Sequence, residues 1–243
     1  MKRICVLGTQ RSGSQYVCKL IENILNSSQY LNVVNISEIF TFKIKATIEI
    51  ENNLLSHLID ATFEYNNEEE HINAMIDIIR QGDVNQPVVM KLFFLFDNKL
   101  THRIIEFLKE LDFIFIKLKR TDVEKQILSF IIAQKTDVWN SRSHQTYQKI
   151  MITEFNHINY IFNNIVKFED DIKMFGMENI PTIIYENAEN DIKKLFSVDF
   201  IEPTSIWKTG LSNPYDQIEN ADEVKAFIQN LLESNPKYQK ATE

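Results

Sequence analysis

Five short apolar runs separated by segments with helical spacing constrain this fold more than any other feature. The runs lie at residues 4–7, 31–34, 87–94, 113–118 and 181–185. Strands that are apolar throughout are buried on both faces, as in a parallel sheet covered by helices on each side. We therefore predict one α/β domain over residues 1–243, with a central, mainly parallel sheet of about five strands flanked by helices.

The segments between these runs predict helices. From Ser14, apolar residues recur at the three- and four-residue intervals of an amphipathic helix. Asp122 is a suitable N-cap for the helix that follows it. The further helical segments are predicted at residues 100–111, 122–138, 188–196 and 219–233, with a helical insertion near 41–84 and a long helical segment, in one or two pieces, near 142–175.

The net charge argues against some classes of binding protein, and the distribution of charge along the chain suggests where an anion site lies. The chain has 26 Lys and Arg against 34 Asp and Glu, a net charge of −8, which argues against a general nucleic-acid or membrane-surface binder. Residues 1–20 nevertheless contain four basic side chains and no acid. This asymmetry suggests a local anion site near the N-terminus, with ordinary solvated surface charge as the alternative.

Cysteine, histidine and hydropathy patterns indicate the compartment. Cys5 falls in an apolar run and Cys18 in a predicted helix, so both are expected to be buried, unpaired thiols in a reducing environment. The five His residues show no metal-ligand spacing, and no metal site is predicted. The apolar part of the N-terminus is too short for a signal peptide, and no run is long enough to span a membrane, so we expect a cytoplasmic protein.

The turn at residues 8–15, between the first strand and the first helix, has the features of a phosphate cradle. A glycine-containing turn there directs backbone N–H groups and a helix N-terminus at one point. Gly8 and Gly13 have the Walker A spacing, but Ser14 replaces its lysine and Gln15 its Ser/Thr. An ATP or GTP hydrolase is therefore disfavoured, and Arg11 remains as the cation of the loop, with plain turn geometry as the alternative.

Two motifs resemble one family of enzymes. Residues 11–14, Arg-Ser-Gly-Ser, resemble the 5′-phosphosulfate loop of sulfotransferases that use 3′-phosphoadenosine 5′-phosphosulfate (PAPS). The closest similarity is to the bacterial branch that resembles trehalose sulfotransferase. The same branch has a second motif after the fourth strand, which is matched here by Arg120, Asp122, Gln126, Ser129, Ala133, Thr136 and Trp139.

Shorter similarities extend the resemblance from about residue 3 to 232. Ser37-Glu38-Ile39-Phe40 is similar to a motif whose Glu is the general base, and residues 89–92 resemble a strand ending in a Lys at the acceptor pocket. Tyr185-Glu186 resembles the family's Tyr-Glu, to which we assign no role, and residues 207–210 resemble a cofactor loop. Residues 41–84 and 142–178 match no motif of the family.

The resemblance implies a P-loop-like three-layer fold and a set of roles. Catalytic roles fall to Arg11, to Glu38 as the base and to Lys91, which would orient the acceptor or the sulfuryl oxygens. The implied cofactor-binding residues are Arg11, Ser12, Gly13, Ser14, Gln15, Tyr16, Arg120, Ser129, Lys208 and Gly210. Within this set, Arg120 and Ser129 would bind the 3′-phosphate, and Tyr16 would supply an aromatic face to the adenine.

Structural alternatives stand beside these roles. Tyr16 and Ser129 would suit packing within their helices, Glu38 would suit a helix N-terminus, and Lys91 would suit a solvated strand end. The alternative for Arg120 is a surface ion pair with Asp122 or Glu124.

The expected activity is transfer of a sulfuryl group from PAPS to an acceptor hydroxyl, leaving 3′,5′-adenosine bisphosphate (PAP). By analogy with the bacterial branch, the acceptor is a carbohydrate or glycolipid, or another small molecule. Two alternatives remain open: a P-loop kinase or nucleotidase without the Walker lysine, and a nucleotide-binding protein without catalysis. No nucleic-acid partner is expected, and the apolar-rich helices are compatible with a homodimer.

Overall fold

The computed structural model of the chain describes residues 3–27, 33–37, 68–81, 87–94, 98–137, 149–202, 204 and 213–238. Within these ranges five strands form one sheet in the order β2-β3-β1-β4-β5, and every neighbouring pair is parallel. The strands are β1 (Arg3–Gly8), β2 (Val34–Ser37), β3 (Val88–Phe93), β4 (Phe113–Lys119) and β5 (Thr182–Ile184). The predicted α/β class with a parallel sheet is confirmed.

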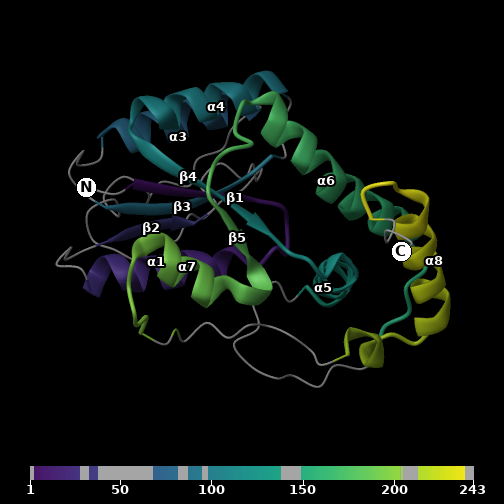
Figure 1. Cartoon of the computed structure of the whole chain (residues 1–243). Helices are drawn as coiled ribbons and strands as arrows, with labels where there is room; N and C mark the ends of the chain where they lie inside the picture. Colours follow the sequence, from purple (N-terminus) through teal and green to yellow (C-terminus); the bar gives the residue numbers. More distant parts are fainter. Residues whose placement is uncertain are drawn as a thin grey trace.

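Helices cover both faces of this sheet. On one face lie α1 (Ser14–Ser27) and α7 (Ala188–Phe196), and on the other α3 (Glu68–Gln81) and α4 (Asn98–Glu110), as Figure 1 shows. Successive side chains of β1 point to opposite faces, so Ile4 packs with α1 and α7 whereas Cys5 packs with α3 and α4. Cys5 and Cys18 are both buried and are not joined in a disulfide, as predicted.

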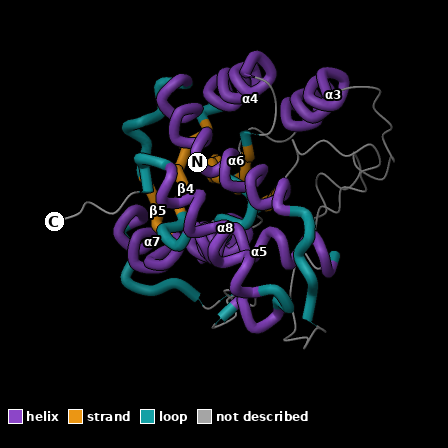
Figure 2. The backbone as a smooth tube through the Cα atoms, turned by 90° about the vertical axis from the view of Figure 1, so that its right-hand side faces the viewer, coloured by secondary structure: helices purple, strands orange, loops and turns teal. Residues whose placement is uncertain are grey.

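A third core joins the remaining helices at the end of the sheet where β4 stops. It contains residues of α5 (Val123–Thr136), α6 (Phe155–Met174) and α8 (Ala221–Ser234), together with Ile152 and Ile218. Figure 2 views the molecule from this end, with α5, α6 and α8 on the side that faces the viewer. The arrangement places α5 beside the carboxyl ends of the strands.

Two sequence-based boundaries are wrong. The second strand was expected at residues 31–34, but β2 runs from Val34 to Ser37. The apolar pattern misplaced it because β2 lies at the edge of the sheet, where polar residues such as Asn35 are tolerated. Residues 149–154 are not helical, because the backbone N–H of Ile152 donates to the Asn220 side chain at 3.0 Å instead.

Only residues 68–81 of the predicted insertion near 41–84 are described, and they form α3. No helix in the described ranges has the length and apolar character needed to cross a membrane.

Candidate functional site

The direction of the chain connections reverses between β1 and β4. These two strands are neighbours, yet the chain leaves β1 toward β2 at one edge of the sheet and leaves β4 toward β5 at the other. In open α/β sheets, ligands bind at the carboxyl ends of strands where the connections diverge in this way. The segments that follow β1 and β4 are the ones that contain Arg11 and Arg120.

The loop after β1 has a strained backbone and an open helix end. Arg11 has a φ of 59°, in the left-handed region, and the backbone N–H of Ser12 donates to the Thr9 carbonyl at 3.2 Å. Because α1 begins at Ser14, the N–H groups of its first turn lack intrahelical partners. The predicted cradle therefore starts at Gly13, since the N–H of Ser12 is used within the loop.

The Ser12 hydroxyl lies inside this loop. Its side chain is buried, with 1% of the residue exposed, and Oγ has no hydrogen-bond partner among the described residues. A Cβ on Gly8 would lie 2.9 Å from this oxygen, so the glycine leaves it room. A buried hydroxyl without a partner calls for an explanation, and a bound anion at the helix end would provide one.

Tyr185 closes the loop from the end of β5. The backbone of Gly13 has a φ of 87°, and a Cβ at this position would lie 2.1 Å from ring atoms of Tyr185. The ring also meets Tyr16 edge-on, with centroids 6.2 Å apart. Gly13 is therefore required twice, by its own conformation and by the ring packed against it.

Helix α5 holds the same loop from the other side. Gln126 is 2% exposed, and its Nε2 donates to Thr9 Oγ1 and to the Gln10 carbonyl, at 2.7 Å each. Near it on the helix, Ser129 Oγ accepts a hydrogen bond from Arg11 Nε at 3.0 Å. The α5 helix thus positions both the backbone of the loop and its cation.

Arg120 lies against the loop rather than in solvent. Its Nη1 donates to the Arg11 carbonyl at 3.3 Å, and its guanidinium carbon is 5.0 Å from the centre of the Tyr185 ring. The guanidinium is paired with Glu186, with Nε 3.8 Å from Oε1. The alternative of a surface pair with Asp122 or Glu124 does not hold, because the side chain is only 9% exposed.

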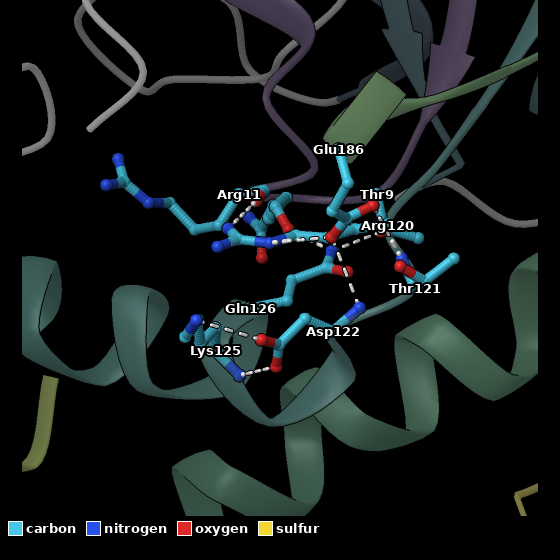
Figure 3. A network of polar contacts seen from close by, with 9 residues as sticks. Thr9, Arg11, Arg120, Thr121, Asp122, Lys125, Gln126 and Glu186 are labelled. Atoms are coloured by element: carbon cyan, nitrogen blue, oxygen red, sulfur yellow. Dashed lines mark hydrogen bonds and ion pairs between the residues drawn. The ribbon is translucent and has the colours of Figure 1, made fainter. Parts of the chain in front are cut away.

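Glu186 joins Arg120 to the start of α5 (Figure 3). Its carboxylate accepts the backbone N–H groups of Thr121 at 3.1 Å and of Asp122 at 3.2 Å. Burial alone would raise the pKa of Glu186, but these backbone hydrogen bonds outweigh it and hold the pKa below its ordinary value. Asp122 itself accepts the Lys125 N–H at 2.9 Å, which confirms it as the N-cap of α5.

Two further predicted residues are buried. The hydroxyl of Tyr16 donates to Glu189, and burial together with this bond raises the pKa of Tyr16, so its position agrees with the packing alternative. Lys91 is 7% exposed, with Nζ 5.7 Å from the centre of the Phe93 ring, and is not the solvated lysine of the alternative. The predicted residues Glu38, Trp139, Lys208 and Gly210 lie outside the described residues.

The structure thus brings together Arg11, Ser12, Gly13, Ser14, Arg120 and Ser129, and it adds residues to which sequence analysis gave no role. The sequence could have indicated the role of Gln126, because it lies three residues before Ser129 and therefore on the same face of the helix. Tyr185 and Glu186 follow β5 directly. In a parallel sheet all carboxyl ends lie on the same side, so these two residues lie on the same side as the loop after β1.

Replacing Gln126 with leucine tests the support of the loop. The variant has a similar side-chain volume but loses both hydrogen bonds from Nε2 to the loop, so we expect about 1–3 kcal/mol less unfolding free energy in urea titrations. The matched control is Gln134→Leu on the exposed side of α5, which should stay within about 0.5 kcal/mol of the parent. Equal effects of the two substitutions would contradict a role of Gln126 in holding the loop.

Neither a scan against protein-family models nor a search of curated proteins finds a match for this chain. Across the described ranges, no three His, Cys, Asp or Glu side chains gather as ligands for a metal ion.

Proposed function

We propose that this protein transfers a sulfuryl group from PAPS to an acceptor hydroxyl. The observation that supports this most is the meeting of Arg11, Arg120 and Ser129 at the carboxyl ends of β1 and β4. Arg120 donates to the backbone of Arg11, and Arg11 donates to Ser129, so the two cations are within reach of one nucleotide. A ligand with an anionic group at each end of an adenosine fits this pair of cations.

The loop after β1 and the start of α5 would bind different phosphates of the nucleotide. The N–H groups of Gly13, Ser14 and Gln15 at the start of α1, with the Ser12 hydroxyl, would bind the 5′-phosphate. Arg120 and Ser129 would bind the 3′-phosphate, each through charge-assisted hydrogen bonds. PAPS supplies the sulfuryl group and the 5′-phosphate from which it departs.

Arg11 is placed to act on the leaving oxygen. As the acceptor oxygen bonds to sulfur, the bond between sulfur and the 5′-phosphate oxygen breaks, and negative charge grows on that phosphate. A cation held in advance by Ser129 stabilises this charge without reorganising.

The acceptor would lie toward β3 and β2. Lys91 lies near the carboxyl end of β3, and Ser37, which ends β2, pairs in register with Met90 beside it. In this proposal Lys91 orients the acceptor, and Glu38, the residue after Ser37, takes the proton of the acceptor hydroxyl. The acceptor class, a carbohydrate or glycolipid, rests on the sequence resemblance alone.

The parallel sheet with helices on both faces is compatible with the P-loop-like three-layer fold of this family, and equally with that of a kinase or nucleotidase. The absence of the Walker lysine at Ser14 favours the sulfotransferase over these alternatives. A nucleotide-binding protein without catalysis would keep the same anion loop, so binding and turnover must be measured separately.

Calorimetric titration with PAP tests the assignment of Arg120. Replacing Arg120 with alanine is expected to weaken PAP binding about 10- to 100-fold, because it removes charge-assisted hydrogen bonds to a phosphate. The control is Arg103→Ala on the exposed surface of α4, where Arg103 pairs with Glu69, and its PAP affinity should match the parent.

Each remaining outcome identifies an alternative. Undiminished PAP affinity in the Arg120 variant would remove the 3′-phosphate assignment. Thermal stabilisation by ATP with Mg²⁺ but not by PAP would indicate the kinase or nucleotidase. PAP binding without any turnover of PAPS across a panel of saccharide acceptors would indicate a binding protein.

A further inference from the structure

The cation proposed to bind the 3′-phosphate already has a protein anion beside it. Arg120 Nε lies 3.8 Å from Glu186 Oε1, in a side chain that is only 9% exposed. The charges of this pair sum to zero, so a free anion approaching Arg120 meets little net attraction. The Glu186 side chain is 37% exposed, but attraction between the two charges is still stronger than for a pair exposed on both sides, because the arginine is largely removed from water.

Glu186 is held in place by more than its ion pair. Its two carboxylate oxygens accept the N–H groups of Thr121 and Asp122, at 3.1 Å and 3.2 Å. These N–H groups belong to the turn before α5, whose own N-cap is Asp122. A swing of Glu186 away from Arg120 would therefore leave two backbone donors without their acceptor, which opposes displacement by a weak competitor.

A second anion-binding element lies close to this pair. The carbonyl of Arg11 accepts from Arg120, so the loop after β1, with the open N-terminus of α1 and the Arg11 side chain, adjoins the Arg120–Glu186 pair. An anion that is covalently linked to a group bound in this loop is delivered to Arg120 at a high effective concentration. A lone anion has no such help and is repelled by the fixed carboxylate of Glu186.

We propose that Glu186 is a specificity-determining residue, an internal counter-ion of Arg120 that suppresses the binding of lone anions at this cation and favours ligands with two linked anionic groups. The inference rests on the proposed function only for the identity of the preferred ligand, a nucleotide with phosphates at both its 3′ and 5′ positions. It predicts that removing the negative charge improves binding of simple anions, whereas a merely structural glutamate would weaken binding or leave it unchanged.

The experiment compares inorganic phosphate and PAP as probes, by calorimetry on the full chain. Glu186→Gln removes the charge but keeps an oxygen that can accept from the two backbone N–H groups. We expect it to bind inorganic phosphate at least tenfold more tightly than the parent. The ratio of PAP to phosphate affinity should fall in the variant, because the lone anion gains more than the tethered one.

Control variants separate local from general charge effects. Glu178→Gln removes the same charge from an exposed residue that precedes β5, on the side of its amino end rather than its carboxyl end, and should leave phosphate affinity unchanged. In the double variant Arg120→Ala/Glu186→Gln the gain should disappear, because the cation is gone. Glu186→Ala also removes the charge and serves if the glutamine variant does not fold.

Unchanged or weaker phosphate binding in a folded Glu186→Gln or Glu186→Ala protein would overturn the inference, as would an equal gain in Glu178→Gln. Failure of the proposed function has a different signature. In that case PAP would bind no protein of the set, while the gain in phosphate affinity on removing the Glu186 charge would still be measurable.

Discussion

Alanine at position 13 is expected to lower the free energy of unfolding by about 2–5 kcal/mol and to abolish nucleotide binding. Two costs combine: a left-handed conformation costs a residue with a Cβ about 1–2 kcal/mol, and overpacking costs about 1–3 kcal/mol. The new Cβ would lie 2.1 Å from the Tyr185 ring, so the ring or the loop has to move. Urea-induced unfolding followed by circular dichroism measures the stability, and titration with PAP measures nucleotide binding by the loop.

Gly176 provides a matched control for this prediction. Its φ is 65°, but a Cβ added there meets no atom within 4 Å, so Gly176→Ala should show only the conformational cost of about 1–2 kcal/mol. In a Tyr185→Ala background, the cost of Gly13→Ala should fall toward the same value. Equal costs for the two glycine substitutions in the parent protein would show that the contact with Tyr185 is unimportant.

Alanine at position 11 is expected to lower the rate of sulfuryl transfer about 10²- to 10³-fold, the effect of removing one preorganised donor at a developing charge. Arg11 is preorganised because its Nε donates to Ser129 at 3.0 Å and its carbonyl accepts from Arg120. The measurement is release of PAP from PAPS in the presence of an acceptor found by screening saccharides.

The control for Arg11 is Lys19→Ala. Lys19 belongs to the same basic N-terminal segment, but it lies on α1 and pairs with Glu22, so its loss should change the rate less than twofold. Arg11→Lys should recover only part of the activity, because lysine keeps the charge but has no guanidinium to donate through Nε to Ser129. A fall of less than threefold in Arg11→Ala would exclude the arginine as the stabilising cation.

Most elements of the fold were predictable because buried strands and amphipathic helices have recognisable patterns of apolar residues in the sequence. Helix α7 covers residues 188–196, as its spacing predicts, and the apolar runs at 87–94 and 113–118 contain β3 and β4. The same signal failed for β2, because an edge strand is not apolar throughout. It also failed at residues 149–154, where backbone groups bond to Asn220 instead of forming a helical turn.

Local sequence determined the anion loop: the glycine spacing, the arginine between the glycines and the helix that begins at Ser14 are all neighbours in the chain. Which groups hold that loop was decided only by the tertiary structure. Arg11 and Ser129 are 118 positions apart, and Asp122 and Glu186 are 64 apart, so no spacing rule connects them. They meet because the carboxyl ends of parallel strands lie on the same side of the sheet and because β1, β4 and β5 are neighbours in it. Hydrophobic periodicity predicts the strands but not their order.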